Sequence, residues 1–416
     1  MESKRIAIEC LNMMKESGVD KAQCLLKNTE KRELSVNLDK IDLLRSTFDA
    51  SLQLTAIVGD RKGVVSINKM EMEDVKKGVE QVVEMAQSSE QDSANDISPR
   101  QPGKVFQSGP ESPDLDLMYD RLDEFMGYAA EAFPKTTFRT VVLNHALTKT
   151  HLLNSNGVDF EEHLGEYSFM VLFSSKEGKR TSSFNYSGYT AHNLDKPIKD
   201  VGSIDTLLRQ SVDQISAQAL KQKFVGDVLV TPDCLESFLS TIEGTLRDYA
   251  LISGGSLFKD KLNQPIADQK LTLHSRPTSK DMSGGYFVTN DGFEAQDNTI
   301  IDHGVLKTFL LSLYGANKTG MERAVNNGDA YVVEPGCTRF DDMIKSIDKG
   351  VMLCRFSGGS PSDNGDFSGV AKNSYYIENG KIQYPINEVM VSIFLISQKS
   401  ASTSVFLSCR GCSSEV

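Results

Sequence analysis

The chain has 416 residues, of which 39% are apolar and 25% are charged, and its 45 Lys and Arg residues against 57 Asp and Glu residues give a formal net charge of −12. The apolar fraction excludes a largely disordered chain, and the negative charge disfavours a nucleic-acid binder, because phosphate neutralisation requires a basic face. The length predicts two or three domains with a sizeable core.

The N-terminal residues and the cysteines favour a cytoplasmic protein. Residues 1–16 predict an amphipathic helix rather than a signal peptide, because charged residues interrupt their apolar positions. The longest apolar run, at 389–396, is far shorter than the roughly 20 residues that a membrane span requires. Seven scattered cysteines, an odd number, do not form the pattern of a disulfide framework. We therefore expect no membrane association.

Residues 1–87 predict a first α+β block. Alternating apolar residues at 34–38 and 52–58 are typical of half-buried strands, and 59–63 predicts a hairpin turn before a return strand at 64–67. Valines spaced at helical intervals from Val75 onward predict a helix. Residues 88–113, rich in Ser, Gln and Pro, predict a linker.

Residues 114–222 predict a second α+β block. It begins with a helix that ends before Pro134. Strands follow at 140–143 and 151–153, with Asn156-Gly157 as a hairpin turn before a run from 160 to 173. A helix around 204–219 closes the block.

Residues 223–392 predict a β-rich C-terminal domain. A strand at 226–230 precedes a helix that starts at Pro232, and beyond residue 265 short strands and turns dominate. Ser-Gly-Gly occurs three times, starting at Ser253, Ser283 and Ser357, and is typical of tight turns. The predicted fold class is α+β: an N-terminal α+β region of two sub-blocks, followed by a β-rich C-terminal domain with a few helices.

The residues alone assign no catalytic, metal-binding or substrate-binding site. None of the six histidines lies three to five residues from another, as a helical zinc motif requires. His145 and His151, six residues apart in a β region, share one strand face and come nearest to a metal pair. A stand-alone metalloprotein with these histidines and a carboxylate as ligands is therefore one hypothesis. Cys409 and Cys412 form a C-x-x-C pair in a Ser-rich tail, where we expect no function.

Phosphate-binding and nucleophile motifs are missing as well. The segment Gly315–Gly320 contains a Lys-Thr pair but not the G-x-x-x-x-G-K-[ST] order of a phosphate loop. The chain contains no G-x-S-x-G sequence, in which a serine nucleophile would stand. We therefore expect no self-sufficient active site in this chain.

Several stretches of the predicted C-terminal domain resemble the TldD/PmbA family, called modulators of DNA gyrase. The most specific is Gly365-Asp366-Phe367-Ser368-Gly369, followed by Ile377-Glu378-Asn379-Gly380. The stretches 291–306 and 333–336 are also similar to family sequence. The resemblance extends over residues 5–392, and residues 393–416 are interpreted as a non-family tail. Cys409 in this tail is a poor candidate for the cysteine ligand of the family.

The family has two kinds of subunit. The TldD kind resembles a zinc metallopeptidase with His-Glu-x-x-x-His on the first helix of the C-terminal domain, whereas the PmbA kind, also called TldE, lacks this motif and pairs with the first. In this chain an ungapped comparison places Ser240, Thr241 and Thr245 at the motif positions. None of these can replace two imidazoles and a carboxylate around zinc.

The resemblance therefore implies a PmbA/TldE-type subunit without a cofactor of its own. It implies zinc in a TldD-type partner and an unfolded or extended peptide as substrate, with no nucleic acid and no membrane as partner. A homodimer is the other assembly that the sequence leaves open. The alternative function is that of a non-enzymatic binding protein that modulates DNA gyrase or another protein target.

Overall fold

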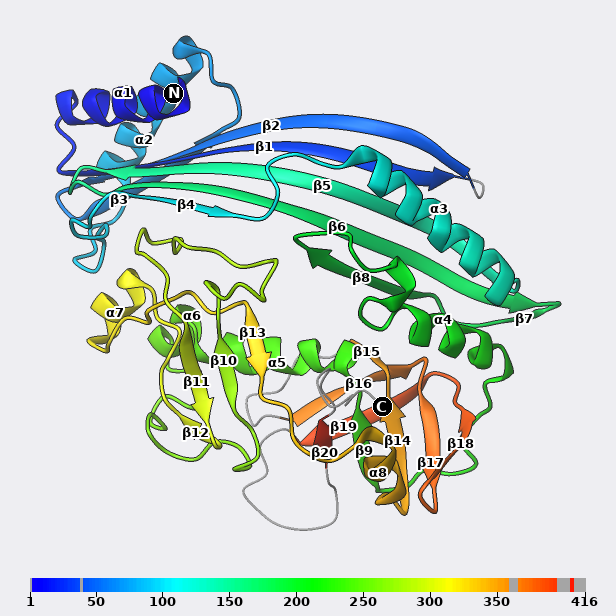
Figure 1. Cartoon of the computed structure of the whole chain (residues 1–416). Helices are drawn as coiled ribbons and strands as arrows, with labels where there is room; N and C mark the ends of the chain where they lie inside the picture. Colours follow the sequence, from blue (N-terminus) through cyan, green and yellow to red (C-terminus); the bar gives the residue numbers. More distant parts are fainter. Residues whose placement is uncertain (1, 38–39, 359–365, 395–404, 408–416) are drawn as a thin grey trace.

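A long, twisted sheet dominates the N-terminal half of the molecule, and a compact β-rich region lies against one of its faces (Figure 1). The computed structural model describes residues 2–37, 40–358, 366–394 and 405–407. Leu38, Gly365, Cys409 and Cys412, which belong to segments considered above, lie outside these ranges.

The large sheet has eight strands. They are β1 (Lys21–Asn37), β2 (Lys40–Val58), β3 (Arg61–Ile67), β4 (Lys104–Ser108), β5 (Thr136–Asn154), β6 (Asp159–Glu177), β7 (Arg180–Thr181) and β8 (Asn185–Ala191). Their order is β3-β2-β1-β5-β6-β4, and β7 and β8 also pair with β6. All pairs are antiparallel except β4 with β6, which run parallel.

Helices cover one face of this sheet, here called the outer face (Figure 1). They are α1 (Glu2–Glu16), α2 (Met72–Ser88), α3 (Leu115–Ala132) and α4 (Ile204–Asp213), with short 3-10 turns η1 (Ile198–Asp200) and η2 (Gln214–Ser216). The predicted valine stripe of α2 is buried against Leu52 and Leu54 of β2. The carboxylate of Asp114 accepts a hydrogen bond from the Leu117 amide at the start of α3.

The other face, here called the inner face, is mostly polar where it is not docked. Because side chains alternate along a strand, the residues between the buried outer positions of β1 lie on this face, among them Gln23 and Lys27. Glu162 and Glu166 of β6 belong to the same face. This face is turned toward the C-terminal region (Figure 1).

The C-terminal region combines three smaller sheets with four helices among the described residues. The helices are α5 (Pro232–Leu246), α6 (Asp248–Ile252), α7 (Leu313–Thr319) and α8 (Phe340–Lys345). The strands are β9 (Asp227–Val230), β10 (Leu273–Ser275), β11 (Asn298–Asp302), β12 (Val305–Leu306), β13 (Tyr331–Val333), β14 (Lys349–Leu353), β15 (Arg355–Ser357), β16 (Asp366–Lys372), β17 (Tyr375–Glu378), β18 (Lys381–Pro385), β19 (Val389–Phe394) and β20 (Val405–Leu407). The sheet orders are β18-β17-β14-β9-β20, β12-β11-β10-β13 and β15-β16-β19.

The structure confirms the α+β fold class and the predicted helices, but it corrects two local predictions. The strands predicted at 140–143 and 151–153 are one continuous strand, β5, whose middle residues alternate between the two faces of the sheet instead of marking a break. The segment 88–113 contributes β4 to the large sheet rather than only connecting two blocks. Because β1 pairs with both β2 and β5, the blocks 1–87 and 114–222 share this sheet.

The described residues contain no helix that is both long and apolar enough to cross a membrane. Strand β20, within the stretch interpreted as a tail, pairs in parallel with β9.

Candidate functional site

A cavity of about 420 Å³ lies between the inner face and the loop of residues 277–287, here called the covering loop. The sheet contributes Lys27 from β1, Thr148 from β5 and Glu166 from β6. His192, directly after β8, completes its polar wall. This space is here called the first cavity.

The covering loop is held in place at both of its ends. Near its start, the Thr278 amide and hydroxyl both donate to Asp297 Oδ1, at 3.1 and 2.8 Å. At its end, the Phe287 and Val288 amides donate to Glu162 Oε1, at 2.9 and 3.0 Å. Gly285 allows the loop to close on itself, because a Cβ there would lie 2.1 Å from the Pro277 carbonyl oxygen. The loop is therefore a fixed wall of the cavity.

Four ionisable side chains line the first cavity: Lys27, Glu166, His192 and Lys280. Burial raises the pKa of Glu166 above its ordinary value, and the nearby His192 and Lys27 offset part of this rise. The hydroxyl oxygen of Ser108 lies 3.3 Å from His192 Nε2. The lining of the cavity thus includes a carboxylate, two ammonium groups and an imidazole, which suits the binding of a charged, polar ligand.

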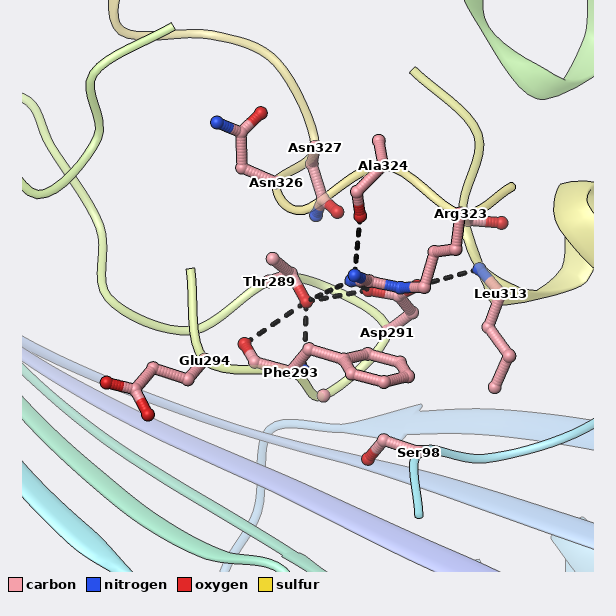
Figure 2. A network of polar contacts seen from close by, with 12 residues as sticks. Ser98, Thr289, Asp291, Phe293, Glu294, Leu313, Arg323, Ala324, Asn326 and Asn327 are labelled. Atoms are coloured by element: carbon pink, nitrogen blue, oxygen red, sulfur yellow. Dashed lines mark hydrogen bonds and ion pairs between the residues drawn. The ribbon is translucent and has the colours of Figure 1, made fainter. Parts of the chain in front are cut away.

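A tight turn formed by residues 289–294 presses the C-terminal region against the inner face beside this cavity (Figure 2). Asp291 holds the turn, because its carboxylate accepts from Arg323 Nη2 at 2.7 Å and from the Leu313 amide at 2.8 Å. The Arg323 guanidinium also stacks on the Phe293 ring, 3.6 Å from its centroid. Burial alone would raise the pKa of Asp291, but Arg323 and the other donors outweigh it and hold the pKa below its usual range.

The segment predicted as a linker is the platform on which this turn and α7 dock. Gln101 Nε2 donates to the Gly292 carbonyl at 2.8 Å, and Lys104 pairs with Glu294 at 2.6 Å. Asp92 accepts from Lys318 Nζ at 2.8 Å and from the Tyr314 hydroxyl at 2.9 Å. Apolar contacts join the polar ones, since Phe287 stacks on Phe106 of β4 at 5.1 Å between ring centroids.

The turn of residues 289–294, here called the docking turn, also lines a second cavity of about 450 Å³ through Asn290 and Asp291. Gln23, Thr55 and Lys62 of the large sheet line it. Arg247, between α5 and α6, and Asp248, the first residue of α6, line it as well. Burial lowers the pKa of Lys62. Gln23 Oε1 is buried and has no hydrogen-bond partner among the described atoms.

Helix α5 carries Ser240, Thr241 and Thr245, which the sequence comparison above aligns with a zinc motif, and these residues do not fit a zinc ion. Ser240 is exposed, and the hydroxyls of Thr241 and Thr245 donate to the α5 carbonyls of Ser237 and Ile242, at 3.1 and 2.6 Å. Zinc requires imidazole, thiolate or carboxylate ligands. The described residues contain no group of three His, Cys, Asp or Glu side chains that could hold a metal ion.

His145 and His151 do share a face of β5, as predicted, but this is the outer face, away from both cavities. Six residues of strand separate them by about 20 Å, so one ion cannot contact both. His145 Nε2 lies 2.8 Å from the Pro110 carbonyl oxygen, and His151 Nδ1 lies 3.7 Å from Glu161 Oε2. Burial lowers the pKa of both imidazoles.

The cavity residues Lys27, Glu166 and His192 were not predicted as a site from the sequence. They come from segments that are distant in the chain, and none of them belongs to a sequence motif. The sequence signal for this surface is the alternation of polar and apolar residues along the long strands. The polar residues share one strand face, and this pattern indicates a face that does not belong to the apolar core.

Two family models match the chain. One, described as the PmbA/TldA metallopeptidase C-terminal domain, matches residues 223–397, and the other, described as domain 1 of the same metallopeptidases, matches residues 24–86. Among curated proteins, the metalloprotease PmbA homolog of Haemophilus influenzae is 22% identical, with 86% of this chain and 81% of that protein covered. The metalloprotease PmbA of Escherichia coli O157:H7 is 21% identical, with coverages of 90% and 84%.

Solved structures show the same fold. TldE from Thermococcus kodakarensis is 20% identical and superposes with a TM-score of 0.77, with 94% of this chain and 91% of that chain covered. A Bacteroides thetaiotaomicron protein named for modulation of DNA gyrase is 24% identical, with a TM-score of 0.78 and the same coverages.

Proposed function

Because the chain belongs to the PmbA/TldD metallopeptidase family, we propose that it is a PmbA/TldE-type subunit that works with a zinc-containing TldD-type partner on unfolded or extended peptides. Its role is to wall the space in which the peptide is held, and the partner supplies zinc and cleavage. The alternative assembly is a homodimer.

The occupancy of α5 carries this proposal. The positions of the zinc motif hold Ser240, Thr241 and Thr245, and the hydroxyls of the two threonines are engaged by the helix backbone. A hydroxyl so bound neither coordinates zinc as an anion nor accepts a proton from a metal-bound water. In this proposal, the zinc ligands for peptide hydrolysis come from another chain.

The large sheet supports a role in holding an extended chain. Strand β3 pairs with β2 only from Leu52 to Val58. In the part of the chain that the structure describes, no strand pairs with residues 40–51 of β2 on that side, so these residues form a sheet edge. A sheet edge binds an extended peptide through backbone hydrogen bonds and requires no particular side chain. The polar inner face adds two cavities for side chains or chain ends.

The test is to prepare this chain alone, a His-Glu-x-x-x-His subunit of the same genome alone, and the two together, and to assay cleavage of an unstructured peptide. We expect the pair to co-elute and to cleave. We expect this chain alone to be inactive. A pair in which the first motif histidine of the partner is replaced by alanine is the matched control. Cleavage by this chain alone would overturn the proposal.

The same preparations test the alternative of a gyrase-modulating protein, which rests on the name of a structural relative. Co-purification with gyrase subunits, without a metallopeptidase partner, would favour that alternative.

A further inference from the structure

Two side chains of opposite charge line the first cavity and do not pair with each other. Lys27 comes from β1 and Glu166 from β6, both on the inner face. Neither forms an ion pair or a side-chain hydrogen bond with another residue in the part of the chain that the structure describes. Unpaired charges in a confined space favour a ligand that brings the complementary charges.

The sheet register gives the separation that such a ligand has to span. Lys27 lies opposite Thr150 of β5, and Thr150 lies opposite Glu162 of β6, four residues before Glu166. Two strand spacings of about 4.8 Å and a rise of about 3.4 Å per residue over four residues place the two Cα atoms about 17 Å apart. Because both side chains extend from the sheet toward the ligand, the gap between their charged groups is shorter than this distance. It corresponds to about two to four residues of extended peptide.

The other walls of the cavity are suited to a backbone. Gly284 of the covering loop exposes its main chain, because a Cβ there would meet no atom closer than the Thr190 hydroxyl at 3.7 Å. Ser108, His192 and Thr148 add neutral or titratable polar groups, and Lys280 adds a second cation at the loop. The volume of about 420 Å³ lies within the usual range of small-ligand sites, about 300–1,000 Å³.

We propose that the first cavity binds a short peptide with both termini free, its ammonium group at Glu166 and its carboxylate at Lys27. The choice of a peptide as ligand rests on the proposed function. The opposite charges of Glu166 and Lys27 require that both the amino and the carboxyl end of the peptide are free. The site then takes short peptides such as the products of cleavage, in the subunit that does not cleave.

Calorimetric titration of the isolated chain with trialanine tests this binding directly. We expect saturable binding, and acetylation of the amino end or amidation of the carboxyl end should each weaken it by about tenfold or more, the loss of one charge-assisted contact. Glu166→Gln should bind trialanine and its acetylated form equally, and Lys27→Met should no longer distinguish trialanine from its amide. Lys149→Met, on the outer face of the same sheet, is the matched control and should bind like the wild type.

Absence of binding to the wild-type chain would overturn the proposal, and so would binding that neither variant nor end-blocking changes. The blocked peptides test the same contacts on the unaltered protein, so a variant that fails to fold does not end the test. The titration uses no partner subunit and no cleavage. Its failure would leave the proposed peptidase complex standing, and failure of the complex would leave this binding result intact.

Discussion

At Gly292, the backbone approaches the inner face so closely that a side chain does not fit. Its φ is +85°, and an added Cβ would lie 2.7 Å from Ser98 Oγ and 2.9 Å from Gln23 Oε1. Gly292→Ala should therefore lose about 1–3 kcal/mol of unfolding free energy from the backbone conformation, and more from the displaced contacts. Denaturant titration of the variant measures this loss.

Gly254 provides the control for this prediction. It also has a positive φ, +74°, but an added Cβ would meet nothing within 4 Å. Gly254→Ala should therefore show the conformational loss alone. Equal losses in the two variants would contradict a tight docking contact at Gly292.

The Asp291–Arg323 pair should make stability depend on acid. Both side chains are 16% exposed, and removing one partner leaves the other charge buried, so Asp291→Asn should lose about 2–4 kcal/mol. The folded pKa of Asp291 lies below its unfolded value of about 3.9. Its contribution is thus complete above that pH and is lost as pH falls through the folded pKa.

Denaturant titrations at pH 7 and near pH 3 measure this effect. The difference between wild type and Asp291→Asn should be large at pH 7 and should shrink at the lower pH. Asp341→Asn, at an exposed position of α8, should differ little from wild type at either pH. A difference that does not change with pH would contradict the role given to the Asp291 charge.

At the scale of elements, the segment 88–113 behaves as a docking surface rather than a tether. Lys318, with the Ala94 amide and Tyr314, lowers the pKa of Asp92 to about 2. Asp92→Asn should therefore loosen α7 and raise its amide hydrogen-exchange rates several-fold at neutral pH, without unfolding the sheet. Because the folded pKa is depressed, the wild type should show the same loosening only as pH falls from about 4 toward 2.

Glu90→Gln is the matched control for α7 exchange, because Glu90 is exposed and its side chain has no partner among the described residues. Unchanged exchange in Asp92→Asn would show that apolar contacts, such as that of Phe287 with Phe106, hold the platform by themselves.

The elements also show what sequence reasoning can reach. Helices α1, α2 and α3 each pack one apolar face against one core. Their prediction therefore needs only the local spacing of apolar residues. The prediction divides β5 in two because its middle residues, two of which line the first cavity, interrupt the apolar pattern. The segment 88–113 is predicted as a linker because it is polar, and in the fold its polar groups bond to α7 and to the docking turn. Lys27 and Glu166 line one cavity only because of the strand order in the sheet, which local sequence patterns do not contain.

For the whole molecule, the sheet is one continuous unit from β3 to β6, and the C-terminal region docks on it at more than one place. Besides the docking turn, Arg355 donates to Asn185 Oδ1 at 2.8 Å, and Gln214 donates to the Ser374 carbonyl at 3.0 Å. We therefore expect that the stability of the fold does not depend on a bound metal ion. The isolated chain should therefore keep its melting temperature when a chelator is added, and elemental analysis should find less than one zinc per chain.

The reason lies in the donors. Neutral hydroxyls occupy the motif positions of α5, and His145 and His151 stand about 20 Å apart on the outer face. A structural zinc would instead be coupled to folding, so its removal would lower the melting temperature sharply. Stoichiometric zinc that disappears in His151→Ala, but not in the control His303→Ala, would contradict the prediction. That outcome would favour a stand-alone metalloprotein, whereas zinc retained only in the presence of a partner subunit would place the metal in that partner.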